Sequence, residues 1–262
     1  MKHRPGTVAV IALLAAGVWG EAPAQPRPTP PRADAGPAAP APAPAPAAAT
    51  VRATFDAEAV GGPSQDFEAV VGDWYVAEAD GQRGLRVDGA RWRQGTPSVS
   101  LADQARRLYG ERYAEFLDGV RAFAFFPLAV HRGPLWTGNY RMSVRFYPQA
   151  GRIDQAAGIS FGIAPDGSYQ NVRANALEDN ILYAQVVRGR RRIMDTIRNV
   201  PTPTRTWHTL VVTVRGRHLT VELDGVRRHE RDLDAPPVGR VGLWSKADSQ
   251  VLFDDFEVRP AP

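Results

Sequence analysis

The sequence predicts an all-β fold, an antiparallel sandwich of two sheets. Short runs of alternating apolar and polar residues recur along the chain, and Gly, Asp and Pro residues separate them, as strands and tight turns require. Asp224-Gly225 lies between two such runs and is a strong signal for a tight hairpin. About a dozen closely spaced strands, with only one helical segment among them, predict a single sandwich-sized domain.

The residues before Val51 are expected to lie outside that domain. Residues 1–24 have a basic start, an apolar core and a small-residue cleavage motif at Ala22-Pro23-Ala24, which together predict a secretory signal peptide. Residues 25–50 are mostly Pro and Ala and predict a disordered linker. We therefore expect an exported protein, periplasmic or extracellular, with its domain over residues 51–262 and no membrane span once the signal is removed. Retention of the apolar segment as an anchor is the alternative.

Composition excludes several classes of site. The chain of 262 residues has no cysteine, which rules out thiolate zinc sites and cysteine nucleophiles. Its histidines show no metal-ligand spacing, and it has no nucleophile elbow, phosphate loop or dinucleotide-binding fingerprint. The formal net charge of +4 is small for this length and gives no indication of a nucleic-acid partner. No cofactor is expected on these grounds, and the oligomeric state is left open.

Strands are expected wherever the alternation is clean. In order they cover residues 53–56, 67–71, 72–76, 84–89, 122–130, 140–146, 207–214, 218–223, 239–244 and 251–258. In the run 140–146, the side chains of Met142, Val144 and Phe146 should face the core. Residues 100–118 break this rhythm with apolar residues at three- and four-residue steps, which predicts one inserted amphipathic helix. The helix is expected to cover an edge or end of the sandwich, or alternatively to form a lid over a ligand site.

The stretch over residues 154–187 contains three extended runs and the densest group of polar side chains within strands. Asn171, Arg173 and Asn175 alternate there with small apolar residues, so a period of two sends the polar and apolar sets to opposite faces of a sheet. Asn is a poor strand former, which indicates a polar binding surface. The alternative is that these side chains only satisfy neighbouring backbone groups or face water.

A basic turn follows this stretch. Residues 188–192 read RGRRR and lie between two expected strands. Most such clusters are solvated hairpin tips, and the alternative is a site that binds an anionic ligand.

Several short motifs, taken in order, resemble a known family. They are residues 72–74 (GDW), 154–159 (DQAAGI), 173–180 (RANALEDN), 207–208 (WH), 242–249 (GLWSKADS) and 253–256 (FDDF). Together they resemble exported bacterial domains of the concanavalin A-like jelly roll, in the laminin G and glucanase-like superfamily, and within it the 3-keto-disaccharide hydrolase family, formerly a domain of unknown function. The resemblance covers residues 54–259 and is most specific in the closing segment. It implies two curved antiparallel sheets with a concave face suited to sugars, in proteins described as carbohydrate-binding or glycoside-cleaving.

The acidic residues do not form the pair that an ordinary glycosidase needs. Such enzymes place two carboxylates on either side of the scissile bond, usually at alternate positions of one strand. Glu222 and Asp224 have this spacing, but Asp224 belongs to the predicted turn. Asp254 and Asp255 are adjacent, so in a regular strand they point to opposite faces. One of them is expected to hold the 245–249 turn; the alternative is calcium, with Asp254 as a possible ligand.

Sugar recognition requires aromatic faces for ring stacking and planar polar groups for hydroxyls. Glu178 is the first candidate for a catalytic acid or base and Asp154 the second, and Trp244 could equally pack in the core. We expect an exported domain that binds a saccharide or sugar-derived ligand. One alternative is a hydrolase or lyase that acts on 3-keto-disaccharides, and another is a surface adhesion or scaffold module. The candidate ligand-binding residues are Tyr169, Asn171, Arg173, Asn175, Asn180, Tyr183, Trp244, Lys246 and Asp248.

Overall fold

The structure is a computed structural model that describes residues 50–92, 108–110 and 126–262. Within these ranges the chain forms fifteen β-strands. At the predicted hairpin, Asp224 and Gly225 have φ values of 52° and 76°, so the tight turn is confirmed. The strands are β1 (Val51–Ala53), β2 (Phe67–Val71), β3 (Trp74–Ala79), β4 (Gln82–Asp88), β5 (Leu128–His131), β6 (Tyr140–Ala150), β7 (Ala156–Ile163), β8 (Tyr169–Asn175), β9 (Asn180–Val187), β10 (Arg190–Arg198), β11 (His208–Arg215), β12 (His218–Leu223), β13 (Val226–Asp232), β14 (Arg240–Trp244) and β15 (Gln250–Pro260).

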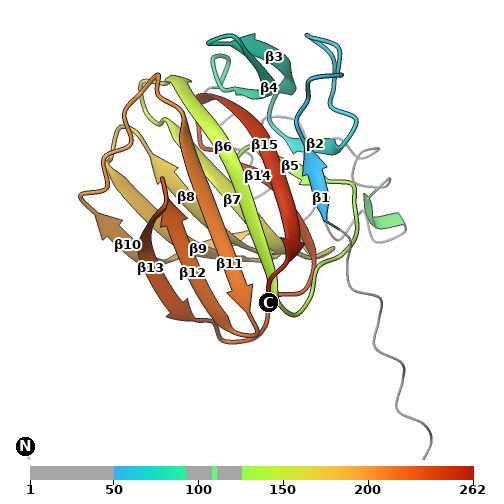
Figure 1. Cartoon of the computed structure of the whole chain (residues 1–262), viewed down its shortest axis with the longest axis vertical. Helices are drawn as coiled ribbons and strands as arrows, with labels where there is room; N and C mark the ends of the chain where they lie inside the picture. Colours follow the sequence, from blue (N-terminus) through green and yellow to red (C-terminus); the bar gives the residue numbers. More distant parts are fainter. Residues whose placement is uncertain (1–49, 93–107, 111–125) are drawn as a thin grey trace, which may run out of the picture. The chain divides into compact units, whose positions relative to one another are not determined.

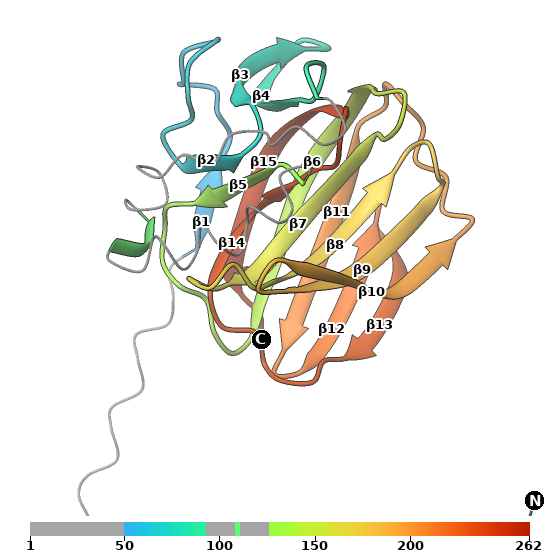
Figure 2. The same ribbon diagram turned by 180° about the vertical axis from the view of Figure 1, so that it is seen from behind.

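The strands form two antiparallel sheets (Figures 1 and 2). One sheet has eight strands, in the order β13-β12-β11-β6-β15-β4-β3, with β1 paired to β15. The other has seven, in the order β10-β9-β8-β7-β14-β5-β2. Neighbouring strands such as β6 and β15 are far apart in the sequence. The chain therefore passes back and forth between the two sheets as it builds them. The predicted antiparallel sandwich of two sheets is confirmed.

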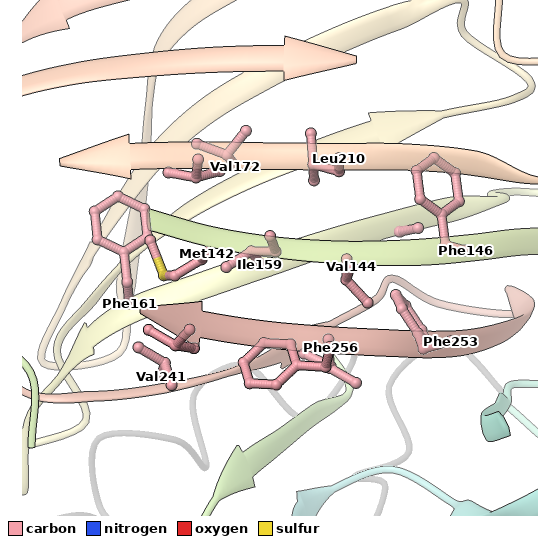
Figure 3. Close-up of a cluster of buried hydrophobic side chains, with 14 of the residues drawn as sticks. Met142, Val144, Phe146, Ile159, Phe161, Val172, Leu210, Val241, Phe253 and Phe256 are labelled. Atoms are coloured by element: carbon pink, nitrogen blue, oxygen red, sulfur yellow. The ribbon is translucent and has the colours of Figure 1, made fainter. Parts of the chain in front are cut away.

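One face of each sheet packs against the other sheet. Met142, Val144 and Phe146 of β6 are fully buried in a cluster that also contains Ile159 and Phe161 of β7, from the opposite sheet (Figure 3). The predicted inward orientation of the three β6 side chains is therefore confirmed. Burial of each such side chain contributes about 1.5–3 kcal/mol to the free energy of folding, and the remaining residues of each strand are left for the outer faces.

Two predicted elements differ from the structure. The first strand was predicted over residues 53–56, but β1 covers Val51–Ala53 and shares only Ala53 with that range, because Phe55 has a φ of 61°, a left-handed conformation that interrupts an extended run. The helix predicted over residues 100–118 lies outside the described residues except at 108–110, where Leu108 and Tyr109 are helical. Within the described ranges, no helix is both long and apolar enough to cross a membrane.

Each sheet ends in a charged edge strand, β10 in one and β13 in the other. Both views show these two strands on the same side of the sandwich (Figures 1 and 2). Asp195 of β10 accepts hydrogen bonds from Arg231 (2.6 Å) and His229 (3.1 Å) of β13. The edges of the two sheets are therefore linked through side chains, although the strands belong to different sheets.

Candidate functional site

The alternation along β8 sorts its side chains between two faces. Val172 and Ala174 lie in the core between the sheets. Asn171, Arg173 and Asn175 point the other way, onto the outer face of the seven-stranded sheet, yet their exposed fractions are only 1%, 1% and 0%. The predicted sorting is confirmed, and the alternative that the polar set faces water is wrong. The other alternative holds for Asn175, whose Oδ1 accepts hydrogen bonds from the backbone N–H groups of Gln155 (3.3 Å) and Leu177 (3.0 Å).

Arg173 is the centre of a hydrogen-bonded cluster at the end of β8. Its guanidinium donates to Asn180 Oδ1 and, over 2.6 Å, to Glu178 Oε2. Asn180 Nδ2 donates to the same carboxylate oxygen over 3.0 Å. The loop between β8 and β9 brings these groups together, because Asn175 and Asn180 pair across it and Glu178 turns back towards Arg173.

A second ion pair adjoins the first. Asn175 Nδ2 donates to Asp154 Oδ1 over 2.7 Å, and Lys246 Nζ lies 2.8 Å from Asp154 Oδ2. Asp154 precedes β7, whose Ala156 pairs with Asn175, and this register places the carboxyl beside the amide. We call the following residues the Arg173 cluster: Asp154, Arg173, Asn175, Glu178, Asn180 and Lys246.

The pKa values of the two carboxyl groups of the Arg173 cluster shift in opposite directions. Burial would raise the pKa of Glu178, but the charge and hydrogen bond of Arg173, with Asn180, outweigh it and hold the pKa below its usual value. Burial raises the pKa of Asp154, and Lys246 only partly opposes this shift. The Glu178 side chain is 39% exposed, whereas that of Asp154 is 0% exposed. Glu178 is therefore an ionised base at the rim, and Asp154 is the buried group that is closer to protonation.

A buried aromatic ring, that of Trp244, lies beside the Arg173 cluster. Trp244 of β14 pairs with Gly158 of β7, which in turn pairs with Arg173. A Cβ atom at Gly158 would lie 2.9 Å from Arg173 Cβ and 3.1 Å from Asn171 Oδ1, so these two side chains occupy the space that the glycine leaves. Trp244 is fully buried, but in the cluster on this outer face rather than in the core between the sheets. Tyr169 belongs to the same cluster, and burial raises its pKa to about 12, so its hydroxyl stays protonated.

Arg191 of the predicted basic turn lies on this face, a placement that the sequence did not predict. Its guanidinium carbon lies 5.0 Å from the ring centroid of Phe126 and 5.7 Å from that of Trp244, within the range of cation–π contacts. The turn consists of Arg188 and Gly189, and β10 already begins at Arg190. Arg191 pairs with Val186 of β9, whose side chain belongs to the cluster on the outer face.

The remaining candidates have separate places. Both carboxylate oxygens of Asp248 accept hydrogen bonds from the backbone N–H groups of residues 152–154, so Asp248 holds the loop that carries Asp154. Tyr183 is buried in the core between the sheets, on the opposite face from Arg173. Asn171 lies on the outer face and accepts a hydrogen bond from Ser160 Oγ over 3.2 Å. The structure therefore brings most of the candidates to one face, and it leaves Tyr183 apart from them.

The outer face of the eight-stranded sheet has a hollow of about 370 Å³. In it Arg145 Nη1 lies 2.9 Å from Asp255 Oδ2 and 3.9 Å from Asp254 Oδ2. The expectation that the two aspartates point to opposite faces is wrong, because β15 has a bulge between Asp254 and Glu257 and Asp255 has a φ of 48°. We call this site the Arg145 hollow; it is lined by Arg52, Thr54, Ser143, Val144, Arg145, Thr209, Asp255, Phe256 and Glu257.

Asp254 is the candidate calcium ligand, and calcium binding there stays a prediction. Burial raises its pKa to about 6, and the guanidinium of Arg145 already provides a cation nearby. In the described part of the chain, no three His, Asp or Glu side chains are grouped as metal ligands. The 245–249 turn is held instead by Ser249, whose Oγ donates to Lys246 O over 2.6 Å.

No family model and no curated protein sequence matches this chain, so the resemblance to 3-keto-disaccharide hydrolases stays a prediction. Among solved structures, the carbohydrate-binding module CBM66 from Bacillus subtilis is similar over 74% of this chain and 95% of its own, with 12% identity and a TM-score of 0.52. The Crh5 transglycosylase in complex with NAG is similar over 82% of this chain and 86% of its own, with 12% identity and a TM-score of 0.50. Likeness at this level of identity concerns the fold, and it confirms the predicted jelly-roll sandwich.

Proposed function

We propose that this chain is an exported protein whose jelly-roll domain binds a saccharide on the outer face of the seven-stranded sheet. The observation that carries the proposal is the Arg173 cluster, where guanidinium, amide and carboxyl groups gather on one outer face, with Glu178 at the rim. Planar polar groups of this kind recognise pairs of hydroxyls. The likeness in fold to a carbohydrate-binding module and to a transglycosylase supports the same ligand class.

Asn171 gives the proposal a specific contact. Its Nδ2 atom is buried and has no hydrogen-bond partner among the described residues. A buried donor left unpaired costs about 1–3 kcal/mol, so a ligand oxygen placed against Asn171 would be favoured. Gln185 of β9 is the matched control, because its amide donates to Tyr183 on the other face of the same sheet.

The test is a thermal-shift screen of the purified protein against a panel of glycans, with and without calcium, followed by calorimetry of each hit. A glycan that binds the folded state will raise the melting temperature. Asn171→Ala should weaken the binding of that glycan about fivefold or more, since one hydrogen bond is lost, and Gln185→Ala should leave it unchanged. Absence of any glycan hit contradicts the proposal and favours a scaffold or adhesion role. Equal effects of the two variants contradict the assignment of the face.

A second candidate function rests on Glu178. An ionised carboxylate at the rim, next to the cations of Arg173 and Lys246, is suited to remove a proton. In a 3-keto-glycoside the C–H bond beside the ketone is acidic. Glu178 would take that proton, the resulting enolate would expel the glycosidic oxygen, and the leaving group would then be protonated from water. Product analysis with 3-keto-disaccharides tests this reaction: Glu178→Gln should abolish turnover and retain ligand binding, whereas unchanged turnover in that variant excludes Glu178 as the base.

A further inference from the structure

The outer face of the seven-stranded sheet contains several buried nitrogen atoms that lack partners. Arg191 Nε and Nη2, Arg173 Nε and Asn171 Nδ2 have no hydrogen-bond partner among the described residues. All four are N–H donors. Unpaired buried donors are uncommon in folded proteins, because they destabilise the state that contains them. A group that accepts hydrogen bonds from them would therefore be bound favourably.

These donors converge on one part of the face. Trp244, Gly158 and Arg173 are paired neighbours on β14, β7 and β8. Arg191 comes from β10, at the edge of the sheet, and its guanidinium reaches across to within 5.7 Å of the Trp244 ring centroid. Burial lowers the pKa of Arg191, and the positive charge of Arg173 lowers it further. Asn171 also leans over Gly158.

The charge around these donors has a positive surplus. Glu178 is hydrogen-bonded to Arg173 and Asn180, and Asp154 lies between Asn175 and Lys246, so both carboxyl groups already have partners. Arg191 adds another cation and forms no ion pair within the described part of the chain. Guanidinium groups pair with carboxylate, phosphate and sulfate oxygens through two parallel hydrogen bonds. An anionic group therefore matches both the donors and the surplus charge.

We propose that the saccharide bound at this face carries an anionic group, a carboxylate or a sulfate ester, which binds between Arg191, Arg173 and Asn171. This inference rests on the proposed saccharide-binding function and names the chemical class of its ligand. Arg191 is half-buried as a residue, and its unpaired Nε and Nη2 atoms are themselves buried beside the aromatic rings of this face. Cation–π contacts with Phe126 and Trp244 hold the guanidinium on this face, and they use none of its N–H groups in an ion pair.

The test is calorimetric titration of the protein with matched pairs of oligosaccharides. Each pair consists of an acidic oligosaccharide and its neutral counterpart: oligogalacturonate or oligomannuronate with its carboxyl-reduced form, and a sulfated galactan fragment with its desulfated form. The acidic member should bind at least about tenfold more tightly, as the loss of a charge-assisted pair predicts. Comparing the uronate pairs with the sulfated pair shows whether the site prefers a carboxylate or a sulfate ester.

Arg191→Gln should remove the preference for the acidic member. Arg192→Gln is the matched control, because Arg192 is the next residue on β10, is exposed and alternates to the other face; it should retain the preference. Circular dichroism checks that both variants fold. If Arg191→Gln does not fold, the salt dependence of binding to the unchanged protein tests the inference instead. Added sodium chloride should weaken binding of the acidic member and leave binding of the neutral member unchanged. Binding of the acidic member that does not depend on salt contradicts the inference.

The outcomes separate this inference from the function it rests on. Equal affinity for both members of every pair, or a preference that survives Arg191→Gln, overturns the anionic ligand and leaves saccharide binding standing. If neither member of any pair binds and the wider glycan panel is also silent, saccharide binding itself is contradicted and the anionic ligand falls with it.

Discussion

The two outer faces of the sandwich differ in whether their arginines are paired with carboxylates. In the Arg145 hollow each arginine has a carboxylate partner, Arg52 with Glu257 at 2.8 Å and Arg145 with Asp255 at 2.9 Å. On the other sheet, Arg191 has no such partner among the described residues, and Arg173 keeps one unpaired nitrogen despite being buried. The arginines of the Arg145 hollow are therefore neutralised within the protein. The outer face of the seven-stranded sheet keeps unpaired cationic groups, as a surface that binds another molecule often does.

Arginine removal is expected to separate the two faces most strongly. Arg173→Met leaves Glu178 and Asn180 without their donor and should lower the free energy of unfolding by about 2–4 kcal/mol. Arg145 is 33% exposed and its partner Asp255 is 49% exposed, so Arg145→Met should cost less than about 1 kcal/mol. Urea unfolding followed by tryptophan fluorescence measures both. Similar losses in the two variants would show that the faces do not differ in this way.

Gly158→Ala tests how tightly the polar face is packed. The new Cβ would lie 2.8 Å from the carbonyl oxygen of Val172 and 2.9 Å from Arg173 Cβ, and neither atom is the flexible end of a side chain. Overpacking of this kind costs about 1–3 kcal/mol, and it should also displace Arg173 and weaken ligand binding. Chemical denaturation and calorimetry give the two values. Unchanged stability and binding would mean that Gly158 is not needed for the position of Arg173.

On the opposite face, the effect of Asp254 should depend on pH. Burial, together with the charges of Asp255 and Asp56, raises its pKa from 3.8 to about 6, against the opposing effects of the Asp255 N–H group and Arg145. A raised folded-state pKa favours the folded state while the group is protonated, so this contribution is full below 3.8 and is lost as the pH rises through about 6. Asp254→Asn should therefore stabilise the protein by about 1–2 kcal/mol at neutral pH and far less near pH 4. Equal effects at both pH values in urea unfolding would contradict the shift.

The smallest expected effect concerns Arg191 in the ligand-free protein. Replacing a half-buried, unpaired cation by Met removes its desolvation cost and should stabilise the protein by about 0.5–1 kcal/mol. Arg192→Met should stay within about 0.5 kcal/mol of the unchanged protein, as exposed substitutions do. Differential scanning calorimetry compares the two. A loss of stability in Arg191→Met would show that Arg191 serves the fold rather than a ligand.

The sequence predicts local alternation well and long-range placement less well. The pattern Asn171, Arg173, Asn175 was enough to predict two faces on β8, since the period of a strand is fixed. The relation of β9 to β8 depends on the loop between them, and that relation decides that Tyr183 faces the core. The bulge in β15 shifts the alternation at Asp255, and no residue type in the sequence marks it.

The charged edges of the two sheets have a consequence for how copies of this chain meet. A free edge strand offers unpaired backbone groups to any other strand, which is a route to aggregation. β10 begins with three consecutive arginines and β13 contains Arg227, Arg228 and Arg231, so stacking like edges would bring positive charges together. Asp195 meanwhile holds the two edges to each other through Arg231 and His229. The arginines on both edges therefore oppose edge-to-edge pairing between copies of this chain.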